Sequence, residues 1–425
     1  MTGMTAVAQG GSLTYRQVLR NGRLATLLTG DAVSKVGDGM AFVALPLLAL
    51  RLHGQVDAAL AISLIRVVPF LLPVAASLLF GLGRRRFDPR TALLVDSVLR
   101  CGVYVGLGLL ALAGSLTFWT LAAGLFAGSV LRLLSASSRR VLAMGMLGED
   151  GWLALNGLIG TTDSLALYVA GPALGGLLAA LTSSGLVLLV NGLTYLAMLV
   201  AALVLPRNGR PDEPGPDKAS ARPGWQILRR TPVAFWLFLT VFLFDLFYGP
   251  VEVALPLLVT GSLHADSRAL GVLWTAFGLG ALVGALLTGQ LYRYPLRFVL
   301  VAIVGGWAAS VGLLAAAPGV VVAGIALAAG GAVYGPFTAV AYTLLQRVLG
   351  RKEQPPVFAL WAGGVAVAAP LGFGLGGPLV AAAGARGGLA VSAVVTALLV
   401  PVAARWLGTA MRPTPAATCR GAASR

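Results

Sequence analysis

Apolar residues along this 425-residue sequence come in long blocks that are separated by short polar turns. A helix needs about 20 predominantly apolar residues to cross a bilayer, and each block reaches that length. The division of residues 298–345 into two helices rests on Pro318 and Gly319, a pair typical of turns. The pattern predicts an all-α membrane protein with twelve transmembrane helices, at about 25–50, 58–82, 92–113, 116–138, 152–181, 185–205, 234–260, 269–291, 297–317, 319–345, 357–383 and 387–407.

A polar segment divides these helices into two groups of six. Residues 206–231 contain several prolines and mixed charges, a composition that cannot bury enough apolar surface to fold alone. We interpret this segment as a cytoplasmic linker between an N-terminal bundle, 25–205, and a C-terminal bundle, 232–407. The tails 1–24 and 408–425 are expected to be cytoplasmic. The apolar run after residue 24 is too long for the core of a cleaved signal peptide, so it is expected to remain as the first helix.

The two groups of helices repeat parts of each other's sequence. The segment Val43–Leu48 recurs as Val253–Leu258, at an offset of 210 residues, in the first helix of the second group. Leu174-Gly175-Gly176 in the fifth predicted helix recurs as Leu375-Gly376-Gly377 in the eleventh, at an offset of 201. Parallel repeats of six helices are one known plan of secondary transporters, with the substrate site between the halves.

Charge is sparse and unevenly placed. Only 11% of residues are charged, yet the net charge is +16. Of the 31 lysines and arginines, 24 fall in the tails, in the inner loops or at inner helix edges, three lie outside, and four lie within spans. This asymmetry predicts that both termini face the cytoplasm of a cell (inner or plasma) membrane, and it explains the basic character without a nucleic-acid partner. The two cysteines form no pattern typical of disulfides or metal ligands, so we expect no metal and no cofactor.

Ionisable residues inside the predicted spans point to function, because a charge at the centre of a bilayer costs at least about 3 kcal/mol unless it is paired or hydrated. Asp31, Lys35 and Asp38 form one stripe on the first helix, where Lys35 could neutralise either neighbour. A plain salt bridge explains Asp31 as well as transport chemistry does. Asp245 and Glu252 share a face of the seventh helix.

Two further pairs of intramembrane charges leave different interpretations open. Asp96 and Arg100 are four residues apart on the third helix, which predicts a structural ion pair. Arg66 and Asp163 fit either gating or packing.

Several motifs in the first and fifth helices resemble one protein family. The first helix contains Gly30, Ser34, Gly37-Asp38 and then Ala44-Leu45-Pro46-Leu47-Leu48, and the fifth contains Gly171-Pro172 with Gly175-Gly176. This pattern resembles the drug, macrolide and siderophore efflux branch (enterobactin-exporter-like) of the major facilitator superfamily, over nearly the whole chain. The fifth-helix motif is similar to the core of that branch's antiporter motif, and ordinary packing of small residues is its other interpretation.

The loop after the second helix resembles the signature cytoplasmic loop of the same family. Gly81, Arg86 and Arg90 match, whereas Arg85 stands where the family usually has an aspartate that contacts the opposite half. The resemblance implies that these residues act in helix packing or gating. A solvated basic loop is the alternative.

The resemblance also implies which residues meet at a central cavity, because in this family the first, fourth, seventh and tenth helices line it. The candidates for proton coupling are Asp38, Asp245 and Glu252, followed by Asp163. Their expected charge partners are Asp31, Lys35 and Arg132, of which Arg132 resembles the arginine of the family's fourth-helix motif. Beside the expected kink at Gly249-Pro250, Phe247 and Tyr248 are candidates for substrate contact.

We therefore expect a secondary active transporter, a monomer in the lipid bilayer, that exports a small hydrophobic or amphipathic molecule such as an antibiotic in exchange for protons. No lysine follows a glycine in a phosphate-binding loop, which argues against ATP hydrolysis, and no nucleophile–base set indicates an enzyme. Alternatives are an uptake permease or lysolipid flippase on the same fold, or a membrane scaffold or signalling partner that transports nothing. The sequence does not distinguish protons from sodium.

Overall fold

The computed structural model describes residues 15–80, 88–147, 151–205 and 224–409, and the secondary structure of this part is helical. The N-terminal half contains α1 (Tyr15–Leu19), α2 (Gly22–Leu52), α3 (Ala58–Phe80), α4 (Pro89–Leu112), α5 (Phe118–Gly128), α6 (Arg132–Gly145), α7 (Trp152–Leu165), the π-helix η2 (Ala166–Ala170), α8 (Gly171–Leu181) and α9 (Ser184–Val204). The C-terminal half contains α10 (Gly224–Arg230), α11 (Pro232–Leu257), the π-helix η3 (Leu258–Ser262), α12 (Ser267–Leu291), α13 (Leu296–Ala316), α14 (Val320–Tyr334), α15 (Phe337–Val348) and α16 (Gln354–Thr409).

The described residues form twelve spans, which confirms the predicted fold class. Ten helical stretches are long and apolar enough to cross a membrane. The last of them, Gln354–Arg405, joins two predicted spans, because the helix turns at Gly384, whose φ of 73° suits a residue without a side chain. The remaining span is built from α5 and α6 together. Pro318 and Gly319 separate α13 from α14, as the sequence predicted.

Two spans that the sequence predicted as single helices are interrupted. The fourth, predicted over 116–138, breaks between Gly128 and Arg132, where the Ser129 hydroxyl donates to the Phe126 carbonyl over 2.7 Å and competes with the helical backbone. The tenth, predicted over 319–345, breaks at Gly335 and Pro336, because proline has no N–H to continue the helix. Both interruptions lie near the middle of their spans.

Local side-chain chemistry defines several helix ends. The side chains of Asp88, Thr117, Ser183 and Asp266 accept from backbone N–H groups in the first turns of α4, α5, α9 and α12, respectively. Each such cap satisfies a donor that has no partner within the helix. At the other end of α13, the Arg386 guanidinium donates to the carbonyls of Ala315 and Ala317 over 2.9 and 2.8 Å. These polar ends set the lengths of the apolar helices.

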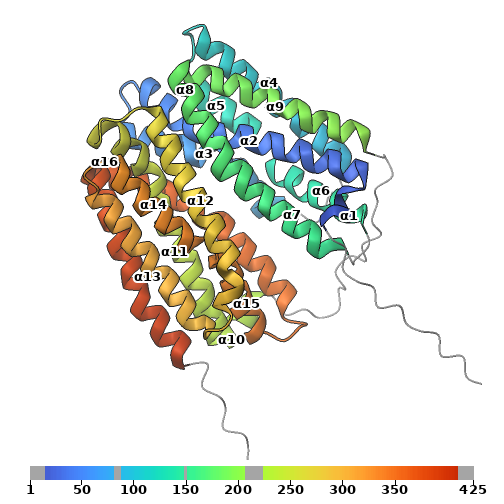
Figure 1. The fold of residues 1–425 in the computed structure, drawn as a ribbon, viewed down its shortest axis with the longest axis vertical. Coiled ribbons are helices and arrows are strands. Elements are labelled where there is room, and N and C mark those ends of the chain that lie inside the picture. Colours follow the sequence, from blue (N-terminus) through green and yellow to red (C-terminus); the bar gives the residue numbers. More distant parts are fainter. Residues whose placement is uncertain (1–14, 81–87, 148–150, 206–223, 410–425) are drawn as a thin grey trace, which may run out of the picture.

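The two halves meet at one end of the molecule and diverge toward the other, as Figure 1 shows. The diverging end carries α1, α10 and α15, and the described chain ends there on both sides of the 206–223 segment. Near the meeting end, the Ser63 hydroxyl donates to the Phe373 carbonyl over 2.7 Å, from α3 to α16. The rings of Phe42 and Trp274 also meet edge to face across the boundary, 4.7 Å apart.

The sequence repeats pack in equivalent places in the two halves. A Cβ atom on Gly175 would lie 2.6 Å from Cα of Met40, and one on Gly376 would lie 2.9 Å from Cα of Pro250. Met40 and Pro250 are separated by the 210-residue offset, and the two glycines by the 201-residue offset. The repeated glycines therefore hold the fifth helix of each half against the first helix of that half.

Candidate functional site

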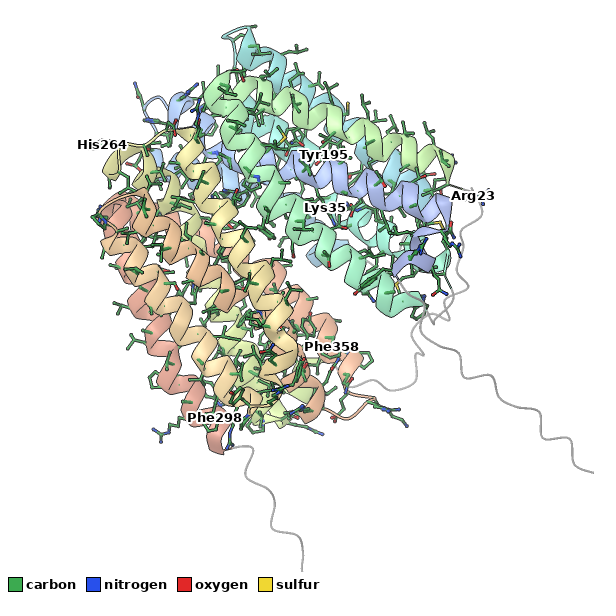
Figure 2. The ribbon with its side chains drawn as sticks, in the orientation of Figure 1. Arg23, Lys35, Tyr195, His264, Phe298 and Phe358 are labelled. Atoms are coloured by element: carbon green, nitrogen blue, oxygen red, sulfur yellow. The ribbon has the colours of Figure 1, made fainter. Side chains whose placement is uncertain are left out.

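A cavity of about 440 Å³ lies mainly in the N-terminal half and reaches the C-terminal half at Glu252 and Phe373. Its walls come from α2, α3, α4, α5, α6 and η2, with α11 and α16 at the boundary between the halves. Figure 2 places Lys35 in the N-terminal half near this boundary, between the meeting end at His264 and the diverging end at Arg23 and Phe298. Seven ionisable acidic or basic side chains line the cavity: Lys35, Asp38, Arg66, Arg100, Arg132, Arg139 and Glu252.

One charge cluster joins α2, α6 and α7. The Lys35 ammonium lies 2.7 Å from the Asp31 carboxylate, one turn earlier on α2, and it also pairs with Asp163 on α7. Asp31 pairs in addition with Arg139 on α6. Asp31 is buried, with 10% of its side chain exposed, whereas 42% of the Asp163 side chain is exposed. Lys35 therefore neutralises Asp31 and Asp163 rather than Asp38.

Asp38 belongs to a second cluster, between α2, α4 and α9. The Tyr195 hydroxyl on α9 donates to the Asp38 carboxylate, and the Arg100 guanidinium donates to the Tyr195 hydroxyl over 3.0 Å. Arg100 also donates to Asp96 over 3.1 Å, the intrahelical pair that the sequence predicted, and lies 4.0 Å from Asp38. Asp38 thus lines the cavity, and its carboxylate is stabilised by a hydrogen bond from Tyr195 and by the nearby charge of Arg100.

Glu252 and Arg66 form an ion pair between the two halves. Arg66 Nε on α3 lies 3.5 Å from Glu252 Oε2 on α11, and neither atom makes a hydrogen bond to another described residue. The Arg66 guanidinium donates to the Phe42 carbonyl over 3.2 Å and lies 3.9 Å above the Phe42 ring. The pair therefore lies at the wall of the cavity, on the side where Phe42 contacts Trp274.

The remaining candidates are distributed between the cavity and the packed core. Arg132 begins α6, is exposed, and lies over the Phe70 ring at 4.9 Å. Asp245 is partly buried on α11 outside the cavity lining, with no hydrogen bond or ion pair to any described residue. Phe247 and Tyr248 also lie outside the lining. Tyr248 stacks on Trp307 at 5.3 Å, within an aromatic cluster of the C-terminal half.

The antiporter-like motif lies at the boundary between the halves. A Cβ atom on Gly176 would meet Cα of Gly271 on α12 at 2.8 Å, and Gly171 contacts Gly39 within its own half. In the opposite repeat, Gly377 lies against Ser63 of α3, with 2.6 Å between the added Cβ and that of Ser63. The π-helical turn η2 ends directly before Gly171 and Pro172. Because proline has no N–H to donate to the preceding turn, the helix departs from regular α-helical geometry there. Small residues therefore bring the two halves into backbone contact.

The signature-like loop is only partly described. Gly81 and Arg86, together with Arg85, lie outside the described residues. Arg90 donates to the carbonyls of Ala202 and Leu203 over 2.9 and 3.0 Å, and so caps the end of α9. For Arg90 the structure therefore gives a packing contact within the N-terminal half.

Sequence reasoning did not identify three residues that complete the charge clusters. In the sequence, Tyr195 is one tyrosine within an apolar span, and Arg139 is one of the basic residues at the inner edge of a helix. Arg100 was assigned only to Asp96. Each of the three contacts a partner on α2 that is far away in the sequence. Tyr195 and Asp38, for example, are 157 residues apart. The periodicity of a single helix does not predict such contacts. Among the described residues, no group of three or more His, Cys, Asp or Glu gathers as a metal site.

Some known proteins are similar to this chain in sequence, and others are similar in fold. The multidrug efflux pump Tap of Mycobacterium tuberculosis (strain H37Rv) is 27% identical over 397 residues, which cover 88% of this chain and 90% of Tap. Tap of Mycolicibacterium fortuitum is 25% identical over 383 residues, covering 86% and 91%. A bacterial homologue of the iron transporter ferroportin, solved in an inward-facing state, superposes with a TM-score of 0.68 at 17% identity, covering 92% of this chain and 99% of that one. A bacterial homologue of the human lysosomal transporter Spinster, inward-facing and unoccupied, gives 0.64 at 14%, covering 94% and 98%.

These similarities confirm the resemblance to efflux proteins that the first and fifth helices indicated, and they indicate a multi-pass membrane transporter rather than an enzyme. The family description matches the chain twice, over residues 27–258 and 237–422, in keeping with the two halves of the fold. The chain belongs to the Major Facilitator Superfamily.

Proposed function

We propose that this transporter is a proton-driven exporter of a small amphipathic molecule, which it moves through the cavity between its halves by alternating access. The observation that carries the proposal is the ion pair between Glu252 and Arg66, which joins the halves at the cavity wall. The names of the Tap relatives, multidrug efflux pumps, support the direction of transport.

The proposed cycle uses the two ends of the molecule in turn. With both termini cytoplasmic, the diverging end faces inward, and substrate enters the cavity from that side. Export then requires the halves to separate where Gly176 meets Gly271 and where Gly377 meets Ser63. At these contacts small residues let the helix backbones approach closely, with no long side chain from either glycine to be displaced when the halves separate.

Protonation provides a way to drive that separation. Glu252 attracts Arg66 only while its carboxylate is ionised, and a proton would remove the attraction between the halves at this point. Asp38 faces Arg100 and Tyr195 in the same cavity and would exchange its proton within the N-terminal half. If the proton binds more tightly to the carboxylates in one conformation of the transporter than in the other, protonation favours that conformation. This difference in affinity is what couples proton movement to transport. Asp163 and Asp245 are the further candidates.

The test is transport by the purified protein in liposomes. We expect an imposed pH gradient to drive accumulation of hydrophobic or amphipathic dyes, and addition of the dye to collapse the proton gradient in return. The variants Asp38→Asn and Glu252→Gln should lower this coupled flux. Asp266→Asn, which alters a helix cap outside the cavity, is the matched control and should retain it. Dye movement that follows a sodium gradient and ignores the pH gradient would exclude proton coupling.

A further inference from the structure

The charges that line the cavity are unequal in number and in pairing. Five of the seven are basic and two are acidic. Both acidic groups already face a cation: Asp38 lies near Arg100, and Glu252 lies near Arg66. A cationic ligand would have to displace an arginine from a carboxylate to gain an ionic contact in the cavity.

Four of the five basic side chains are themselves paired. Lys35 and Arg139 share Asp31, Arg100 contacts Asp96, and Arg66 contacts Glu252. Arg132 differs, because no carboxylate of a described residue lies within 4.0 Å of its guanidinium, which lies instead over the face of the Phe70 ring. A cation in a membrane cavity is stabilised by water or by an opposite charge. Among the described residues no carboxylate supplies that opposite charge, so the exposed Arg132 guanidinium is accessible to an anionic ligand.

The surroundings of Arg132 suit a ligand with two different ends. Phe70 lies one turn after Arg66 on α3, so the two residues share a face, and the Arg132 guanidinium covers the Phe70 ring. Arg66 Nε is a buried donor without a hydrogen-bond acceptor among the described residues. Tyr104 and Tyr168 add aromatic wall to the same cavity. A planar apolar body can pack on these rings while its acid group reaches Arg132.

We propose that the transported substrate is an amphiphile with an acidic group, such as a carboxylate or a sulfonate on a flat apolar body, and that Arg132 is the residue that binds this group. This inference names the substrate class of the proposed function and rests on it. A guanidinium binds a carboxylate through charge-assisted hydrogen bonds, which are about twice as strong as neutral ones. Arg132 would then select acids over cations of the same shape.

Three pyrene probes of matched shape test this selection: pyrenebutyrate, pyrenebutanol and a pyrenylbutyl-trimethylammonium salt. Binding to the full chain in nanodiscs is titrated without any pH gradient, and the signal of empty nanodiscs is subtracted. We expect pyrenebutyrate to bind at least about tenfold more tightly than the alcohol, as one charge-assisted contact implies, and the ammonium probe to bind no better than the alcohol. Tighter binding of the ammonium probe, equal binding of all three, or no binding of any would overturn the inference.

Variants at Arg132 assign the selection to that residue. Arg132→Gln should remove the preference for pyrenebutyrate, whereas Arg132→Lys, which keeps the positive charge, should retain most of it. Arg293→Gln is the matched control, because Arg293 is exposed and lies outside the cavity lining. If the Arg132→Gln variant prefers pyrenebutyrate as strongly as the Arg293→Gln control does, Arg132 is not the residue that selects the acid.

The binding assay and the flux assay fail in different ways. If the ammonium probe is pumped by the pH gradient and pyrenebutyrate is not, the exporter stands and the acidic substrate class is wrong. If pyrenebutyrate binds through Arg132 but no gradient moves any probe, the binding site stands and the proposed function is wrong.

Discussion

The guanidinium of Arg66 and the carboxylate of Glu252 lie 3.5 Å apart across the boundary between the two halves. Their side chains are only 10% and 9% exposed, so the pair is buried at the wall of the cavity. A buried pair of this kind contributes little net stability relative to apolar residues, but the loss of one partner leaves an uncompensated charge. The pair is therefore better suited to distinguishing two conformations than to stabilising one of them permanently.

This arrangement predicts that single and double variants differ. Glu252→Gln and Arg66→Met should each weaken the closed end, because each leaves one group unpaired, and the double variant should restore part of the closure, with a coupling of about 1–3 kcal/mol. Closure can be measured as thiol labelling of Ser267→Cys, at a position whose hydroxyl contacts the Gly176 carbonyl across the boundary. Additive effects of the two substitutions would show that the pair does not act as a unit.

The glycines at the helix contacts predict a second outcome. Gly175→Leu and Gly376→Leu should lower folding yield or transport, because the backbone of a neighbouring helix occupies the space that a side chain needs. Overpacking of this kind destabilises by about 1–3 kcal/mol or more, which a thermal unfolding assay can detect. Gly102→Leu on α4 is the control, since no described atom lies within 4 Å of an added Cβ there. Unchanged stability and transport in both variants would show that close helix packing does not require glycine at these two positions.

The sequence predicts some features of this molecule and not others, for physical reasons. Hydrophobic blocks and the two repeats predicted the twelve-helix fold, because the bilayer imposes one length and one composition on every span. The break at Ser129 has no sequence signal within its apolar run. Gly335-Pro336 does carry one, but a proline inside a membrane span is compatible with an unbroken helix, so the pair alone did not predict the break. Charge partners were found where they are one helical turn apart, as for Asp96 and Arg100, and missed where they lie on different helices, as for Asp38 and Tyr195.

The cluster around Asp31 predicts an asymmetry between two carboxylates. Asp31 is buried and shared by Lys35 and Arg139, whereas Asp163 is 42% exposed and contacts Lys35. Asp31→Asn should therefore destabilise the protein by about 3 kcal/mol or more, and Asp163→Asn by about 1 kcal/mol or less. Thermal unfolding of the detergent-purified variants measures both. Adding Arg139→Gln to Asp31→Asn should recover part of the loss, and equal effects of the two single substitutions would contradict this account.

The distribution of basic residues predicts the orientation of the chain. Reporter fusions at Gly215 in the linker and at both termini should be active on the cytoplasmic side, and a fusion at Ser115 between α4 and α5 on the outer side. An outer signal from Gly215 would mean that the number of spans in the first half is odd, and the inward direction of the diverging end would have to be reversed.

Asp38 provides the most direct test of coupling, because it lines the cavity and is held by two groups whose loss has different consequences. Asp38→Asn keeps the size of the side chain and its ability to hydrogen-bond, but it cannot exchange a proton. We expect this variant to bind substrate and to catalyse downhill exchange, while accumulation driven by a pH gradient falls to the level of empty liposomes. Tyr195→Phe removes the hydroxyl that donates to Asp38 and leaves the carboxylate in place, so it should weaken coupled transport without abolishing it.

Matched amide variants extend this test to the other carboxylates. Asp245→Asn and Glu252→Gln are measured beside Asp38→Asn under the same gradient, and at least one of the three should lose uphill transport. Lys35→Met should leave Asp38 unaffected, because Lys35 pairs with Asp31 and Asp163 instead. If all three amide variants accumulate substrate at the parental rate, coupling does not pass through these residues. Asp163, which is half-exposed and shares Lys35 with Asp31, would then be the carboxylate to substitute next, since it remains as an ionisable partner within the same cluster.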